Sequence, residues 1–382
     1  MKNTISLNRV GLQFNLYLIL DWQTWASAKK SIPYLKKNIN SKNIVIVSSP
    51  KILGEDLLGC DFLDENTVVE GLSFDSVREY IEKLGGTPKN TGWYLQQFIK
   101  LGLCRNCQND YYLVWDADTI PLNKIEFFDK SGKPFFNLKR EYFYSYFRTI
   151  ENLFAIKKST KESFISEHMI FNSEICRNML NRIESNDKFE GENFWQKILC
   201  ASELLKPDFI KKDQRFFSEF ETFGTFCDHF YPNFYAKRKL RTLRHGTDFL
   251  GKNPTDEVLE WAAKDFDTVS FEEWGMPIPE MILMIENPVH RTKISFANTI
   301  RLFFKKERRK IFEKFPKINH EQFKNFFEKT IAKTNFDFFF GKKLAYGQKF
   351  HWGERSLFWR IRPLYVTKCR IQRYWRLLTF KF

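Results

Sequence analysis

Residues 111–119 read Tyr-Tyr-Leu-Val-Trp-Asp-Ala-Asp-Thr and decide the fold. Five apolar or aromatic residues end abruptly in two carboxylates, Asp116 and Asp118, and Pro121 then blocks helix continuation. This pattern predicts a buried strand that delivers an Asp-x-Asp pair to its carboxyl end. Ligands collect at such strand ends in open α/β sheets, and paired carboxylates suit a hard divalent cation that carries phosphate oxygens. The alternative is an ordinary solvated turn, because Asp-x-Asp is common by chance.

The segments around this strand alternate between strand and helix patterns. Strands are expected at 15–20 and 43–48, with a helix at 26–38 between them. This order and spacing imply a parallel pair joined by a right-handed crossover. Further helices are expected at 75–84, 91–102, 174–183 and 193–205. The sequence therefore predicts the α/β class, with a Rossmann-like mixed sheet flanked by helices.

The positive charge of the chain is concentrated at its C-terminal end. The 382 residues carry a formal net charge of +15 at pH 7, and residues 301–382 hold 22 Lys or Arg against 6 Asp or Glu. The rest of the chain is therefore close to neutral. We place a domain boundary near residue 300, between a main domain at 1–300 and a basic, aromatic, mainly helical extension at 301–382.

Basic and aromatic residues alternate in this extension, which leaves three interpretations open. Arg370 and Arg373 are separated from Trp375 and Leu378 at helical spacing, which predicts an amphipathic helix. Such a helix suits the anionic inner leaflet of a membrane, where aromatic residues lie at headgroup level. A nucleic-acid surface and simple packing on the main domain are the alternatives. We favour the membrane.

The sequence pattern leads us to expect neither a secretion signal nor a membrane-spanning segment. No apolar segment approaches the roughly 20 residues that span a bilayer. The seven cysteines are an odd number scattered along the sequence, which argues against a disulfide framework. We expect a cytoplasmic protein that associates peripherally with the inner face of the cytoplasmic membrane.

Five ordered motifs together carry more information than composition. They lie at residues 92–100, 115–119, 166–171, 218–224 and 244–246. In order and spacing they resemble a bacterial glycosyltransferase family of GT-A type, found in lipopolysaccharide and capsule biosynthesis. The resemblance implies a GT-A-like fold and a hexosyl- or N-acetylhexosaminyltransferase. Its donor would be a nucleotide sugar, with a UDP-sugar favoured, and its acceptor a saccharide or lipid-linked saccharide.

The same resemblance, together with side-chain chemistry, assigns the metal and the donor site. Asp116 and Asp118 would hold Mn²⁺ or Mg²⁺ against the donor diphosphate, with His245 as a third ligand. Arg244 would face the phosphates. Four positions of the expected helix at 91–102 are candidates for donor binding: Trp93, Gln96, Gln97 and Lys100. The alternative is that the apolar residues of this helix only pack in the core and its polar residues only face solvent.

An inverting transferase also needs a base for the acceptor hydroxyl, and carboxylates are the usual choice. Glu219 and Glu221 are the candidates. They would share one face of a strand but diverge by about 200 degrees on a helix. Glu167 and His168 form a competing pair that could instead bind acceptor hydroxyls. The alternative to a transferase is a metal-dependent nucleic-acid-binding protein or phosphodiesterase that uses the basic extension, although no nucleic-acid partner is expected.

Overall fold

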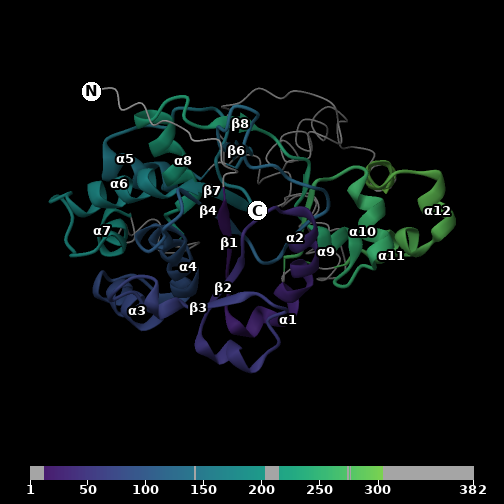
Figure 1. Cartoon of the computed structure of the whole chain (residues 1–382), viewed down its shortest axis with the longest axis horizontal. Helices are drawn as coiled ribbons and strands as arrows, with labels where there is room; N and C mark the ends of the chain where they lie inside the picture. Colours follow the sequence, from purple (N-terminus) through teal and green to yellow (C-terminus); the bar gives the residue numbers. More distant parts are fainter. Residues whose placement is uncertain (1–12, 142, 203–214, 273–274, 276, 304–382) are drawn as a thin grey trace, which may run out of the picture. The chain divides into compact units, whose positions relative to one another are not determined.

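The structure is a computed structural model that describes residues 13–141, 143–202, 215–272, 275 and 277–303. Its main sheet has the strand order β3-β2-β1-β4-β7 (Figure 1). The strands are β1 Phe14–Ile19, β2 Ile44–Ser48, β3 Asp61–Asp64, β4 Tyr111–Trp115 and β7 His168–Asn172. Neighbouring strands are parallel except for β4 and β7, which are antiparallel. The predicted mixed sheet is confirmed.

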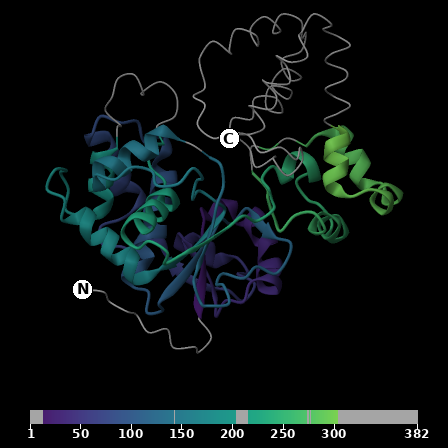
Figure 2. The ribbon, with the colours of Figure 1, turned by 90° about the horizontal axis from the view of Figure 1, so that it is seen from above.

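Helices cover both faces of this sheet. Those of the N-terminal part are α1 Trp25–Ala28, α2 Ile32–Asn38, α3 Phe74–Lys83, α4 Thr91–Gly102, α5 Tyr144–Phe154, α6 Ser173–Glu184, α7 Phe194–Ala201 and α8 Glu219–Phe230. α1 and α2 lie on one face, whereas α4, α6 and α8 lie on the other (Figure 1, Figure 2). The short strands β5 Thr119–Pro121, β6 Phe135–Asn137 and β8 Ala236–Arg238 complete this part. The predicted α/β class is confirmed.

One predicted helix is interrupted. The segment expected as a single helix at 26–38 forms α1, a 3-10 turn at Lys29–Ser31 and then α2. Pro33 lies in the first turn of α2. The N–H groups of a first turn make no hydrogen bond within the helix, so the N–H that proline lacks is not needed there. A continuous helix would have placed this proline in its interior, where the ring clashes with the preceding turn.

The strand order creates a topological switch point between β1 and β4. From β1 the chain adds β2 and β3 on one side, and it later returns to add β4 on the other side of β1. The crossover connections therefore diverge at the carboxyl ends of β1 and β4. A crevice at such a point is where open α/β sheets bind ligands.

Strand β4 is the centre of the hydrophobic core. All five of its residues are buried, as expected of a strand covered by helices on both faces. Tyr112 stacks on Phe171 of β7 with ring centroids 5.0 Å apart, and Trp115 stacks on His168 at 4.6 Å. Both are directly opposed cross-strand pairs, which are the units that stabilise a sheet. This packing fixes the strand that carries the two aspartates.

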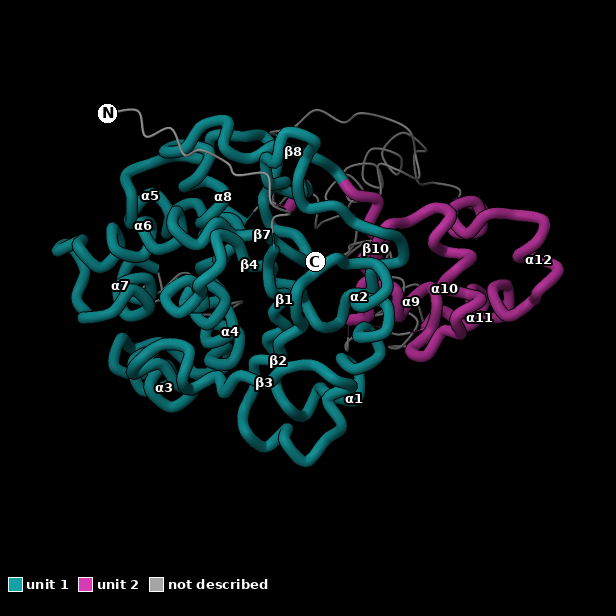
Figure 3. Tube along the Cα trace, viewed as in Figure 1, with its two compact units in different colours: residues 1–139, 143–239 teal, residues 140–142, 240–382 magenta. Residues whose placement is uncertain are grey.

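The chain divides into two compact units, one of residues 1–139 and 143–239 and one of residues 140–142 and 240–382 (Figure 3). The described elements of the second unit are β9 Thr242–Leu243, α9 Gly246–Leu250, α10 Asp256–Ala263, β10 Thr268–Ser270, α11 Pro279–Glu286 and α12 Pro288–Lys293. It has a core of its own, in which Phe296 contacts Trp261 at 5.1 Å and Phe266 at 5.7 Å between ring centroids. The predicted domain at 1–300 therefore spans both units. The extension predicted at 301–382 lies almost entirely outside the described residues.

None of the helices in the described ranges is both long enough and apolar enough to cross a membrane.

Gly224 of α8 provides a test of the packing of the first unit. A Cβ atom at this position would lie 2.2 Å from Cγ of Phe164, a fully buried ring. We expect Gly224→Ala to lower the free energy of unfolding by about 1–3 kcal/mol, because overpacking outweighs the helix propensity gained. Chemical denaturation measures the effect, and Gly54→Ala, which has open space around it, serves as the control. Equal stability of the two variants would contradict this packing.

Candidate functional site

The Asp-x-Asp pair lies in a tight turn directly after β4. Asp116 donates its N–H to the carbonyl of Glu167 at 2.8 Å and accepts from the N–H of Thr119 at 3.0 Å. The indole of Trp115 donates to the carbonyl of Thr119 at 2.8 Å. The Asp116 side chain is 33% exposed, and Asp118 is exposed and accepts a hydrogen bond from the Thr119 hydroxyl. The predicted position of the pair at the carboxyl end of a buried strand is confirmed.

Helix α4 is anchored to the same edge of the sheet. Gln96 donates its side-chain amide to the carbonyl of Ile19, the last residue of β1, at 2.8 Å. Lys100, one turn later, reaches Asp116 after β4. Side chains of α4 thus contact both strand ends that flank the switch point.

Lys100 is a buried cation held between two carboxylates. Its ammonium lies 2.8 Å from Oδ1 of Asp116 and 2.8 Å from Oε1 of Glu219. Burial lowers the pKa of Lys100, but the two carboxylates outweigh burial and hold this pKa well above its usual range. The residue is therefore charged at any pH at which the protein works, and it places a fixed positive charge beside the Asp-x-Asp turn.

Glu219 is the first residue of α8 and is 2% exposed. Besides Lys100, it contacts the side chain of Gln97, whose amide nitrogen, when turned toward the carboxylate, donates to both of its oxygens. Burial raises the pKa of Glu219, whereas the Lys100 ammonium opposes this rise. The Glu219 carboxylate is therefore enclosed by the Lys100 ammonium and the Gln97 side chain.

Glu221 is fully buried two residues further along α8. Its Oε2 accepts from the Ser163 hydroxyl at 2.7 Å and from the N–H of Phe164 at 2.9 Å, and its Oε1 pairs with Lys158 at 3.0 Å. These contacts tie the segment before β7 to α8. Because the two glutamates lie on a helix, the alternative in which they share one face of a strand is excluded. Their assignment as catalytic bases stays a prediction.

Trp93 lies three residues before Gln96, about 4.5 Å closer to the N-terminus along the α4 axis. It is half-buried and stacks on Tyr146 with ring centroids 6.4 Å apart, and the guanidinium of Arg215 lies 6.0 Å from its ring. A half-buried indole is consistent with sugar stacking, and equally with surface packing. Its donor role stays a prediction.

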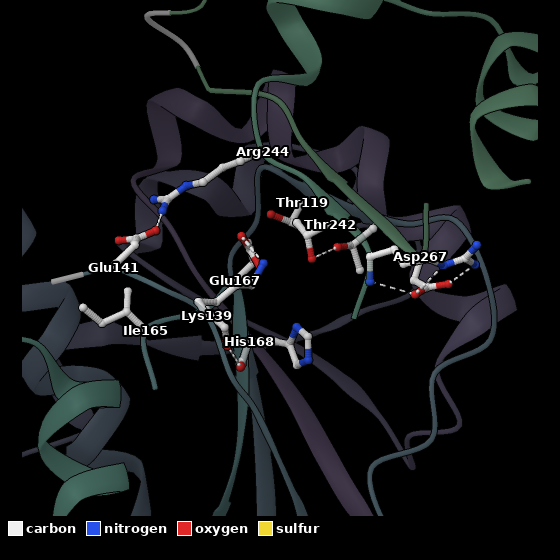
Figure 4. A network of polar contacts seen from close by, with 12 residues as sticks. Thr119, Lys139, Glu141, Ile165, Glu167, His168, Thr242, Arg244 and Asp267 are labelled. Carbon is white, nitrogen blue, oxygen red and sulfur yellow. Dashed lines mark hydrogen bonds and ion pairs between the residues drawn. The ribbon is translucent and has the colours of Figure 1, made fainter. Parts of the chain in front are cut away.

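Glu167 and His168 occupy a buried environment (Figure 4). Glu167 pairs with the equally buried Lys139 at 2.8 Å. His168 packs between Trp115 and Phe127, and burial, followed by the charges of Arg238 and Lys139, lowers its pKa well below the usual range. His168 is therefore neutral. Its side chain is also only 3% exposed, and both facts favour a core role over the predicted contact with an acceptor.

Arg244 and His245 belong to the second unit. The Arg244 guanidinium pairs with Glu141 (Figure 4). It also pairs with Glu272 at 3.2 Å. Burial and then Arg244 lower the pKa of His245, which is 2% exposed. Gly246 completes this motif because a Cβ there would lie 2.8 Å from the carbonyl of Ser270. Asp116 and Asp118 belong to the first unit, so a metal site that joins them with His245 stays a prediction.

The chemistry of the turn fits a divalent cation. Mg²⁺ is held by one or two protein carboxylates and completes its coordination with water and substrate phosphates. Asp118 is exposed, and Lys100 engages Asp116 through Oδ1. Within the described ranges, no group of three or more His, Cys, Asp or Glu side chains is placed to hold a metal ion. Two carboxylates are thus the donor set that the described part of the chain offers at this edge.

The pairing of two lysines, the buried Lys139 and the half-buried Lys158, was not anticipated from the sequence. Lys139 neutralises Glu167, and Lys158 neutralises Glu221. Lys139 is 28 residues from Glu167 in the sequence, and Lys158 is 63 residues from Glu221. No local sequence pattern predicts either pair. A general rule did predict that some cation would be present, because a buried carboxylate needs a cation or several hydrogen-bond donors beside it. The rule does not say which lysine supplies the charge.

Comparison with known proteins gives a family and a set of distant structural matches. A family of unknown function, DUF6492, matches residues 17–233, more than half of the chain. A search among curated proteins finds no match.

Several of the solved structures that match are described as glycosyltransferases. Mouse xyloside xylosyltransferase 1 is 13% identical with a TM-score of 0.35, and the match covers 70% of this chain and 99% of that chain. The bifunctional glycosyltransferase WbbM is 13% identical with a TM-score of 0.35, over 77% of this chain and 52% of that chain. The galactosyltransferase LgtC is 9% identical with a TM-score of 0.33, over 68% and 87%. Likeness at this level says nothing about substrates or residue roles.

Proposed function

The chain belongs to DUF6492, a family of unknown function, and we propose from its own site that it is a metal-dependent glycosyltransferase. The observation that carries this proposal is the Asp116–Asp118 turn at the carboxyl end of β4, beside the switch point with β1. A nucleotide sugar presents a diphosphate, and this edge offers two carboxylates for a cation together with the ammonium of Lys100. The transferred group is a hexose or N-acetylhexosamine, with UDP as the favoured nucleotide.

The residues of the turn have distinct parts in this chemistry. Asp118, and Asp116 directly or through water, would hold Mn²⁺ or Mg²⁺. When bound, the cation neutralises charge on the departing nucleoside diphosphate. Lys100 adds a positive charge that needs no metal, because its ammonium lies 2.8 Å from Asp116 at the same edge. Arg244 and His245 of the second unit are proposed as additional contacts to the phosphates and the metal.

A nucleic-acid-processing enzyme is the second candidate, and the described residues favour it less. Nucleases of this kind use two metals about 3.5–4 Å apart, which requires several clustered carboxylates. Among the residues described here, no cluster of three metal-ligating side chains is present. The basic residues that would contact phosphates lie at 301–382, mostly outside the described part of the chain.

The proposed acceptor is a saccharide or lipid-linked saccharide of a bacterial surface glycan, lipopolysaccharide or capsule, and the C-terminal residues are proposed to dock the enzyme on the inner leaflet. Residues 355–382 contain eight Lys or Arg. Deleting them is expected to lower sedimentation with anionic liposomes roughly 10-fold or more, since each basic residue near such a surface contributes about 1 kcal/mol. Hydrolysis of soluble donor should persist, and neutral liposomes provide the control. Unchanged sedimentation would refute the docking.

The transferase proposal is tested with a panel of nucleotide sugars and Mn²⁺. We expect release of a nucleoside diphosphate from at least one donor, most strongly from a UDP-sugar, and loss of this release when EDTA removes the metal. If no nucleotide sugar is turned over while a phosphodiester substrate is, the second candidate replaces the first.

A further inference from the structure

The two glutamates at the start of α8 have different surroundings, although they lie two residues apart. Glu221 holds the segment before β7 through Ser163 and Phe164. Glu219 contacts α4 through the side chains of Gln97 and Lys100, and Lys100 in turn contacts Asp116. A chain of direct contacts thus leads from Glu219 to the Asp-x-Asp turn.

From these contacts we infer that Glu219 is a positioning residue, which acts through Lys100 to set the place and charge of the Asp116 carboxylate. This inference rests on the proposed function, because it concerns the same phosphate-binding edge. It replaces the role of base for Glu219, since a side chain that is 2% exposed and engaged by an ammonium and an amide does not reach an acceptor hydroxyl.

The need for such a residue follows from the flexibility of lysine. Its four-carbon stem has many rotamers, and fixing one of them costs conformational entropy. Lys100 is fixed at both ends: the Tyr112 hydroxyl donates to its carbonyl at 3.1 Å, and Glu219 holds its ammonium at 2.8 Å. The ring of Phe220, next to Glu219, lies 4.6 Å from the ammonium. Glu219 therefore determines where the charge of Lys100 is presented.

The charge balance gives Glu219 a second effect. Lys100 is shared by two carboxylates, so Glu219 takes part of its charge and leaves Asp116 only partly neutralised. Without the negative charge of Glu219, Lys100 would pair with Asp116 alone. Asp116 would then offer less negative charge to a cation.

The test measures binding of UDP in the presence of Mn²⁺ by calorimetry, which does not depend on turnover. Glu219→Gln keeps the shape of the side chain and is expected to weaken UDP binding about 10- to 100-fold, the usual effect of losing a residue that orients a ligand-binding group. Asp228→Asn is the matched control, because Asp228 lies on the same helix and pairs with Lys237, outside the contacts of Glu219, Lys100 and Asp116. It is expected to lower the unfolding temperature and leave UDP affinity within about twofold, the scatter of an uncoupled site.

A double-mutant cycle separates positioning from a direct contact. If Glu219 acts through Lys100, Lys100→Met combined with Glu219→Gln should bind UDP no more weakly than Lys100→Met alone. Additive losses would overturn the inference, as would unchanged affinity in Glu219→Gln. Failure of the wild-type protein to bind UDP with Mn²⁺ would instead overturn the proposed function. A crystal structure of Glu219→Gln then decides whether Glu219 sets the position of the Lys100 ammonium. An ammonium that still lay 2.8 Å from the side chains of both residues 116 and 219 would refute the inference.

Discussion

Asp118→Ala is expected to reduce release of nucleoside diphosphate from a nucleotide sugar at least about 100-fold, which corresponds to about 2.7 kcal/mol of lost transition-state stabilisation. The reason is that Asp118 is the exposed carboxylate of the turn and is the side chain proposed to bind the cation. Because Asp118 is exposed at the end of a strand, its removal should leave the fold intact. The initial rate of diphosphate release with saturating Mn²⁺ measures the effect.

Asp110→Ala provides the control for this variant. Asp110 is also an exposed aspartate, but it precedes β4 and so lies at the opposite end of the same strand. Its removal should leave the rate unchanged. A rate for Asp118→Ala close to that of Asp110→Ala would mean that the Asp-x-Asp turn is a solvated surface feature, and the site would have to be sought elsewhere.

Lys139→Met is expected to lower the free energy of unfolding by about 3–5 kcal/mol, because it leaves the buried charge of Glu167 without its cation. Lys139 and Glu167 are 2% and 6% exposed at their side chains and lie 2.8 Å apart. Urea denaturation followed by tryptophan fluorescence measures the change. The double variant Lys139→Met with Glu167→Leu should recover much of the loss, since no unpaired charge then remains.

The control for this pair is Lys239→Met. Lys239 also pairs with a glutamate of the first unit, Glu162, but its side chain is 55% exposed. Exposed pairs contribute about 0–1 kcal/mol, so this substitution should have little effect. If Lys139→Met were equally mild and instead weakened binding of a saccharide acceptor, the predicted acceptor role of Glu167 would regain support.

The main sheet could be predicted from the sequence because its strands are marked locally. Residues 111–115 form an uninterrupted apolar run bounded by carboxylates, and a strand buried on both faces gives this pattern. The parallel pair β1 and β2 follows from the spacing of strand, helix and strand. The antiparallel addition of β7 has no such signal, since the sequence does not state on which side of β4 the chain returns.

The conformation around Glu219 and Glu221 stayed open because their spacing fits both a strand and a helix. A decisive signal was present three residues before Glu221. Ser218 followed by Glu221 is the serine-x-x-glutamate pattern of a helix start, and in the structure the Ser218 hydroxyl accepts from the N–H of Glu221 at 3.3 Å. Reading this cap would have placed both glutamates in the first turn of α8.

The partners of the site residues could not be predicted from the sequence. Lys100 and Glu219 are 119 residues apart, and the contact between them depends on how α4 and α8 pack on one face of the sheet. The sequence indicated which residue types would gather at the edge. Only the tertiary structure shows that Asp116 shares a buried lysine with Glu219, which changes the expected role of that glutamate.

The central claim is that the Asp116–Asp118 turn binds the diphosphate of a nucleotide sugar through a divalent cation. A crystal structure with Mn²⁺ and UDP tests it most directly, because anomalous scattering locates the metal. The account predicts a manganese peak coordinated by a carboxylate oxygen of Asp118 and by oxygens of the diphosphate, at the carboxyl ends of β1 and β4. Manganese and UDP bound away from this turn would contradict it.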